Sequence, residues 1–205
     1  MRKILAGLAA VVALGALSIG PAIAARADPP GRHANNCVHP SSGISLNELF
    51  HATEQFVGPI CTGLTAGEHW RAIVGDYEAE TANAVYPPGY VPLYANPVDD
   101  VLAKTTIKVV VDGGTRQEKV YTFGPSDTDA FRLDVRIHDL NPAFPDLPGF
   151  FVIPRMPPLS PGHHTHELIW IVSSMHCDGT STDEATSCLA GENPVFVRAT
   201  DVAIP

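Results

Sequence analysis

The chain has 205 residues, of which 45% are hydrophobic, and a formal net charge of −9 with neutral histidines. This length allows one domain with a substantial core. The excess of acids disfavours nucleic acid and anionic membranes as partners, because both are bound by clustered Lys and Arg.

Residues 1–27 have the three parts of a secretory signal peptide. Arg2 and Lys3 give a positive start, residues 4–19 are apolar, and small residues follow up to Ala27. The apolar run falls short of the roughly 20 residues that a membrane-spanning helix needs, which disfavours the alternative of an uncleaved anchor. We therefore expect cleavage after Ala27 and a secreted or envelope-associated protein with no stable membrane span.

Four cysteines follow this segment, at Cys37, Cys61, Cys177 and Cys188. An even number of cysteines in an exported chain predicts two disulfides. Of the three pairings, we favour the two local ones, Cys37 with Cys61 and Cys177 with Cys188. A zinc site is the alternative, but the spacings contain no Cys-x-x-Cys pair.

The first part of the expected mature chain combines an arm and a helix. Residues 28–44 are rich in Pro, Gly and Asn and predict an extended N-terminal arm, and residues 45–205 predict a single domain. Ser45 and Glu48 have the spacing of a capping box. Apolar residues at helical spacing then predict a short helix over residues 46–57, ended by a Gly-Pro pair.

The middle of the chain predicts strands and one helical turn. Residues 69–77 form one candidate strand. Asn96, a following proline and two acids are typical of a helix start, so a helical turn is expected over residues 97–104. Residues 107–111 and 119–123 flank an Asp-Gly-Gly-Thr turn and predict a hairpin.

The remaining part predicts further strands. Apolar and polar residues alternate over residues 131–137, the clearest half-buried strand pattern in the chain. Residues 150–153, 164–173 and 195–202 complete the set. Within the second of these, residues 168–172 are apolar on both faces, which favours a central position for that strand. About seven short strands separated by turns predict an all-β fold, mainly an antiparallel β-sandwich.

Several stretches carry a resemblance to a known group of proteins: residues 156–164 with their Leu-Ser-Pro-Gly-x-His pattern, 88–92, 96–104, and the His-Cys-Asp-Gly pattern of 175–179 with Cys188. In these stretches the chain resembles immunoglobulin-like domains of uncharacterised secreted bacterial proteins. The resemblance implies an exported, immunoglobulin-like β-rich domain and carries no catalytic residues with it.

The histidines near residue 164 suggest a metal site. His164 and His166 would share one face of a strand. The first candidate for a third ligand is His176, and the alternatives are His138, Glu167, His33 and His39. Neutral imidazoles suit copper or zinc. The alternative is that these histidines are solvated beside His163 or pack at the strand edge. A cupin-type metal-dependent enzyme is a further alternative, although Glu167 directly follows His166 and would face the opposite side.

Tyr86, Tyr90 and Tyr94 lie in a proline-rich loop and are candidates for a surface that binds a sugar or a protein. Nucleophilic catalysis has little support, because there is no Gly-x-Ser-x-Gly elbow and the closeness of Ser160 to the histidines in sequence is expected by chance. The first interpretation is therefore a secreted, non-enzymatic binding or envelope-associated protein that contacts an extracellular ligand. A copper- or zinc-binding protein is the second interpretation.

Overall fold

The structure is a computed structural model that describes residues 37–58, 61 and 63–203. The predicted signal peptide, residues 1–27, and most of the predicted arm lie outside the described residues. Strands hold 40% and helices 13% of the described part of the chain, which confirms the all-β class. The immunoglobulin-like β-sandwich stays a prediction.

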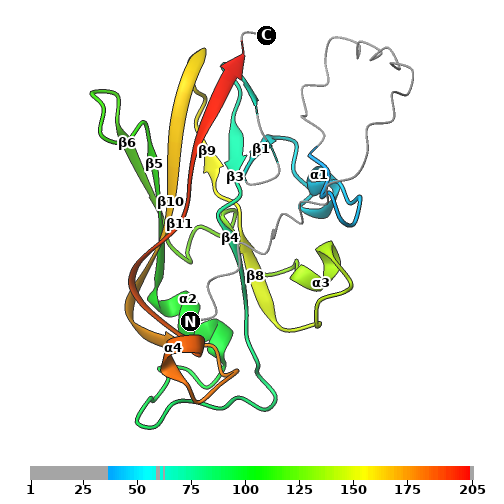
Figure 1. Ribbon diagram of the computed structural model, residues 1–205. Helices are drawn as coiled ribbons and strands as arrows, with labels where there is room; N and C mark the ends of the chain where they lie inside the picture. The colour runs from blue at the N-terminus through cyan, green and yellow to red at the C-terminus, as the bar shows by residue number, and fades with distance from the viewer. Residues whose placement is uncertain (1–36, 59–60, 62, 204–205) are drawn as a thin grey trace, which may run out of the picture.

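The largest sheet has five strands, with β10 at its centre (Figure 1). In spatial order they are β2 (Leu64–Thr65), β11 (Cys188–Ala203), β10 (Gly162–Cys177), β5 (Thr105–Val111) and β6 (Lys119–Phe123). All neighbouring pairs are antiparallel except β2 with β11. The central position predicted for residues 164–173 is therefore confirmed, and so is the predicted hairpin, which is formed by β5 and β6.

Two three-stranded sheets make up the other side of the molecule. One has the order β1 (Gln55–Val57), β3 (Trp70–Ala72) and β9 (Arg155–Met156). The other has the order β4 (Gly75–Glu78), β8 (Gly149–Val152) and β7 (Phe131–Arg132). The strand predicted over residues 69–77 is thus divided between β3 and β4, and each part joins a different sheet.

The main core lies between the five-stranded sheet and the two smaller sheets. Ile107 and Trp170 enter it from the large sheet, and Trp70, Tyr77 and Phe150 enter it from the small ones. Both tryptophans are almost completely buried, as expected for core residues. Each large side chain removed from water in this way contributes about 1.5–3 kcal/mol, so this layer packing is the principal source of stability.

A second core cluster lies beneath the first helix. Phe50, Phe56 and Phe151 pack together there, next to the disulfide that joins Cys37 to Cys61. The second disulfide joins Cys177 to Cys188 at the ends of β10 and β11. Both bonds are the local pairs favoured from the sequence.

The described residues form four short helices. They are α1 (Leu46–Leu49), α2 (Pro97–Lys104), α3 (Ile137–Leu140) and α4 (Glu184–Ser187). The helical turn predicted over residues 97–104 is confirmed as α2, with the Asn96 side chain accepting a hydrogen bond from the Val98 N–H. Among the described residues, no helix has the length and apolar character needed to cross a membrane.

The helix predicted over residues 46–57 is wrong beyond its first turn. His51 adopts a positive φ of 48°, which ends α1, and the Asn47 side chain donates to the carbonyls of Ala52 and Glu54. An Asn side chain that binds nearby carbonyls competes with helical pairing. The chain then changes direction and enters β1, which is buried and paired with β3.

The strand predicted over residues 131–137 is also wrong after its second residue. Phe131 and Val135 are buried, but they belong to different core clusters. The chain turns between them, Leu133 is exposed, and Arg132 binds the Asp134 carboxylate across the turn. The apolar alternation therefore reflects two separate burial sites and not one continuous strand face.

Candidate functional site

Helix α2 brings two charged residues to a buried position. Asp100 and Lys104 lie one turn apart, so both side chains occupy the same side of the helix. The Lys104 ammonium is 2.7 Å from Asp100 Oδ2, and the Asp100 side chain has no exposed surface. This helix and the loop before it lie at the end of the molecule where α4 also lies, at the bottom of Figure 1.

The Asp100 carboxylate accepts five hydrogen bonds from three parts of the chain. The donors are the Tyr90 hydroxyl, the Lys104 ammonium and His176 Nδ1 to Oδ2, and the backbone N–H groups of Leu93 and Tyr94 to Oδ1. Burial acts to raise the pKa of Asp100, but the bonds from Lys104, His176 and Tyr90 outweigh it, and the pKa lies far below its usual range. The carboxylate therefore stays ionised and fastens the loop to α2 and β10.

His176 connects this carboxylate to the core. Its Nδ1 lies 2.6 Å from Asp100 Oδ2 and its Nε2 lies 2.5 Å from the Tyr77 hydroxyl. Burial lowers the pKa of His176, so the ring is neutral at pH 7. Because the ionised carboxylate can only accept, Nδ1 carries the proton and Nε2 accepts from Tyr77. Burial also raises the pKa of Tyr77 well above its usual value, which keeps the phenol protonated.

The three candidate tyrosines have different positions. The rings of Tyr86 and Tyr90 lie 5.3 Å apart, and the Lys104 ammonium lies 5.4 Å from the Tyr90 ring centre. Burial raises the pKa of Tyr90 to about 12. Tyr94 is exposed. The Tyr90 hydroxyl is therefore bound to the Asp100 carboxylate and the Tyr86 ring lies beside the Tyr90 ring, whereas Tyr94 is the most exposed of the three.

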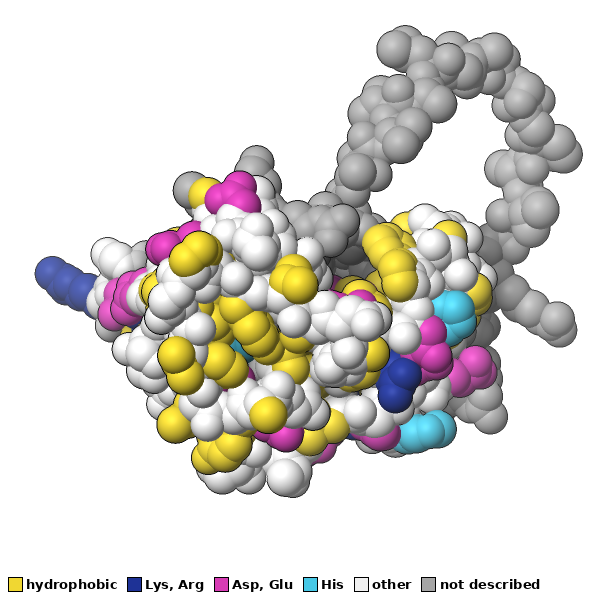
Figure 2. Space-filling model, turned by 90° about the horizontal axis from the view of Figure 1, so that it is seen from below, with side chains coloured by type: hydrophobic (Ala, Val, Ile, Leu, Met, Phe, Trp, Pro, Cys, Tyr) yellow, Lys and Arg dark blue, Asp and Glu magenta, His cyan; other side chains and the backbone are white. Residues whose placement is uncertain are grey.

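Exposed apolar side chains gather on this supported loop. Val91 is 83% exposed and Leu93 65%, although both are large apolar residues. Five of the nine exposed large apolar side chains of the described residues belong to this end of the molecule, and we call them the loop-end surface: Val85, Val91, Leu93, Tyr94 and Met175. Figure 2 looks onto this end and shows yellow side chains grouped together on it.

The loop-end surface is fixed to the body of the molecule by several contacts. Met175 offers its carbonyl to Lys104, and the Val85 N–H donates to the Gly179 carbonyl. The Cys177–Cys188 disulfide closes the neighbouring segment that carries α4. A surface held in this way loses little conformational entropy when it binds a partner.

The predicted metal ligands do not form one group. His164 and His166 share the inner face of β10, as expected, but His176 lies ten residues further along the strand, about 30 Å away at the usual strand rise. His164 Nδ1 lies 2.7 Å from Asp112 Oδ2, and the His166 ring packs against Trp70. In the described part of the chain, no three His, Cys, Asp or Glu side chains are grouped to hold a metal ion.

His164 also approaches Ser160. Its Nε2 lies 3.4 Å from the Ser160 hydroxyl and 3.0 Å from the Ser160 carbonyl, while Nδ1 faces the Asp112 carboxylate. This is the order hydroxyl, imidazole, carboxylate found in serine hydrolases. The nearer oxygen is the carbonyl, which has no proton to give, so the ring serves to fasten the turn before β10 to the end of β5.

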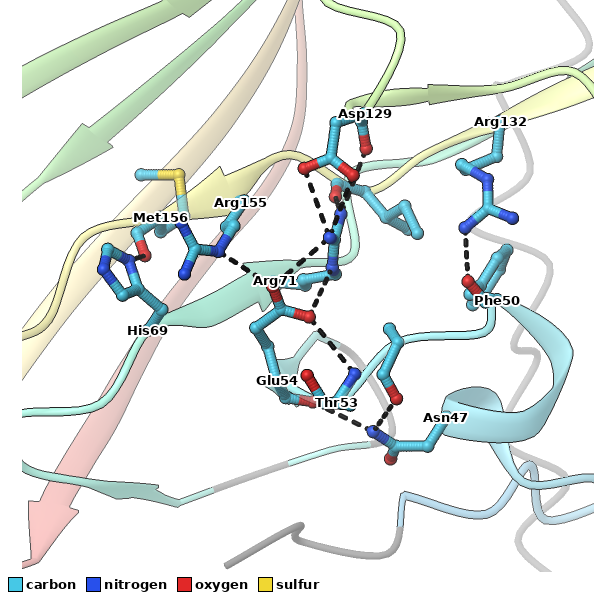
Figure 3. A network of polar contacts seen from close by, with 12 residues as sticks. Asn47, Phe50, Thr53, Glu54, His69, Arg71, Asp129, Arg132, Arg155 and Met156 are labelled. Atoms are coloured by element: carbon cyan, nitrogen blue, oxygen red, sulfur yellow. Dashed lines mark hydrogen bonds and ion pairs between the residues drawn. The ribbon is translucent and has the colours of Figure 1, made fainter.

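A network of ion pairs lies on the opposite side of the molecule, near α1 (Figure 3). The Arg71 guanidinium binds the carboxylates of Glu54 and Asp129, and Arg155 binds Glu54 as well. Two cations face two acids, and Arg71 also donates to the carbonyls of Asp129 and Ile153. The network ties β3 to the segments on either side of it and leaves no unbalanced charge for a ligand.

Sequence reasoning missed the central residues of the supported loop. Asp100 was expected only to favour the start of α2, and neither Lys104 nor Tyr77 was expected to contribute. The spacing of Asp100 and Lys104, four residues apart, was a visible signal for an ion pair. The contact with His176 was not visible, because it joins residues 76 positions apart.

No family model, no curated protein and no solved structure matches the chain.

Proposed function

We propose that this protein is an exported protein-binding domain and that the loop-end surface is its contact surface. The observation that carries the proposal is the grouping of exposed apolar side chains on a loop with a rigid support. Contiguous apolar surface is costly to leave in water and commonly marks a binding site. The expected signal peptide and the two disulfides support a function outside the cytoplasm, where disulfides persist.

The composition of the loop favours a protein as the partner. Residues 85–95 contain no charged residue and three tyrosines, and Met175 lies beside them. Protein interfaces are enriched in Tyr and Met at their centres and depleted in charge. A sugar-binding surface would require exposed aromatic rings for stacking, but Tyr86 and Tyr90 are turned towards the supporting network and only Tyr94 is exposed.

Site-specific cross-linking in the host that exports the protein tests this function. A photoreactive group is placed at Val91 on the loop-end surface and, as the matched control, at Val120 on β6, which is 52% exposed. We expect a discrete protein adduct from position 91 alone. Adding Leu93→Asp is expected to abolish the adduct, and adding Leu133→Asp, an exposed position on the turn after β7, is expected to preserve it.

Two results would overturn the proposal. One is equal labelling from positions 91 and 120, which would mean that contacts at the loop end are random. The other is labelling of lipid alone from position 91, which would make the loop a membrane contact. Thermal unfolding of each variant confirms that a lost adduct reflects lost contact and not loss of the fold.

A further inference from the structure

The charge distribution around the loop-end surface is one-sided. Residues 75–104 and 173–191, which form this end of the molecule, contain eight acids and a single cation, Lys104. Lys104 is buried and its ammonium is bound to Asp100 and to the Met175 carbonyl. This end of the molecule therefore presents apolar side chains and carboxylates, with no exposed Lys or Arg to balance them.

Three exposed acids lie on elements that are fixed to the loop. Asp99 is exposed on α2, directly beside Asp100, which binds the loop backbone. Asp183 and Glu184 are exposed at the start of α4, and the segment before α4 is joined to Val85 through the Gly179 carbonyl. We call Asp99, Asp183 and Glu184 the acidic rim.

One carboxylate of the acidic rim is fixed by a backbone hydrogen bond, and the rim lacks a cationic partner in the described residues. The Asp183 carboxylate accepts from the Ala185 N–H at the start of α4, and the rim has no cationic neighbour in the described residues that would neutralise it. Exposed charges within about 10 Å of a binding surface still act on a partner at physiological salt. A partner with acids at its own contact face would be repelled, and one with cations would be attracted.

Building on the proposed function, we infer that the partner is a protein segment with an apolar centre flanked by Lys and Arg. The apolar groups would cover the loop-end surface and the cations would meet the acidic rim. A second copy of this chain does not fit, because two acidic rims would face each other across a symmetric contact. An anionic membrane is disfavoured for the same electrostatic reason.

Three synthetic amphipathic peptides of equal length and equal leucine content test this inference against the mature protein. Their polar positions are all Lys, all Gln or all Glu, and binding is measured by calorimetry or fluorescence anisotropy. We expect the Leu/Lys peptide to bind most tightly and the Leu/Glu peptide not to bind. The affinity of the Leu/Lys peptide is expected to fall severalfold between 50 and 300 mM NaCl.

Matched variants separate the contribution of the apolar loop-end surface from that of the acidic rim. Neutralising the rim with Asp99→Asn, Asp183→Asn and Glu184→Gln is expected to weaken Leu/Lys binding roughly tenfold, towards the level of the Leu/Gln peptide. Neutralising three acids distant from the loop, with Glu118→Gln, Asp127→Asn and Glu167→Gln, is expected to change it less than twofold. Val91→Ser with Leu93→Ser is expected to weaken all peptide binding.

Each outcome has a defined meaning. If the serine variant loses binding but the rim variant does not, the binding surface stands and the basic partner is refuted. If the serine variant binds as the wild type does, the proposed function itself fails. Binding to neutral phosphatidylcholine vesicles in place of the peptides, or a dimer that the serine variant abolishes, would also overturn the inference.

Discussion

At the scale of single residues, Asp100 carries the largest number of contacts in the candidate site. Its carboxylate is completely buried, and its five donors come from α2, β10 and the loop. A buried carboxylate is tolerable only when paired and hydrogen-bonded, and removing its charge leaves the buried Lys104 ammonium unpaired. The position of the loop therefore depends mainly on the Asp100 carboxylate.

Asp100→Asn is expected to destabilise the protein by about 3 kcal/mol, because it leaves the buried Lys104 cation without its counterion. Urea denaturation at pH 7 measures the change. Asp99→Asn is the matched control, because Asp99 is an exposed neighbour on the same helix and is expected to change the unfolding free energy by less than about 0.5 kcal/mol. Equal effects of the two variants would show that the network contributes nothing.

Ionisation of Asp76 lowers the stability of the fold, whereas ionisation of Asp100 raises it. It lies on β4, and burial, assisted by the nearby Glu78 carboxylate, raises the pKa of Asp76 to about 7. The folded state therefore binds a proton that the unfolded chain releases near pH 4, so stability falls as the pH rises from about 4 to about 7. The low pKa of Asp100 has the reverse effect, since its contribution is lost as the pH falls below about 4.

Asp76→Asn is therefore expected to stabilise the protein at pH 8, by about 1–2 kcal/mol for this half-buried group, and to have little effect at pH 4. Chemical denaturation at the two pH values measures the difference. Destabilisation at pH 8 would mean that the ionised carboxylate has a stabilising partner.

At the scale of secondary structure, local signals predicted some elements fully and failed on others. Helix α2 was predicted with its correct bounds because its signals, the Asn96 cap and the following proline, act within one turn. The strand expected over residues 131–137 failed because Phe131 and Val135 are buried in different clusters, which only the tertiary arrangement determines. The candidate site could not be predicted from the sequence for the same reason, since Tyr77, Asp100 and His176 are brought together only by folding.

The two disulfides support different elements, and this predicts different effects of removing them. Cys177–Cys188 closes the segment beside the loop-end surface, and Cys37–Cys61 lies in the second core cluster. Replacing either pair with serines is expected to cost about 2–4 kcal/mol. Only the Cys177→Ser, Cys188→Ser variant is expected to weaken Leu/Lys peptide binding as well. The binding isotherms of the two folded variants measure this, and equal weakening would contradict the assignment of the surface.

At the scale of the whole molecule, the fold has two unlike ends. The main core joins the large sheet to the small ones, and the charge-balanced Arg71 network lies near α1. The loop end is uncharged at its centre and acidic at its rim, and its backbone is fastened to α2 and β10. The charges of the Arg71 network are therefore balanced within the protein, whereas the loop end presents apolar surface that nothing in the described chain covers.

Hydrogen exchange of the mature protein, free and saturated with the Leu/Lys peptide, tests this account most directly. We predict new protection over residues 85–95 and 173–177, with no change in the hairpin over residues 107–123 at the edge of the sheet. Protection confined to the hairpin or to the α1 segment, with the loop unchanged, would contradict it.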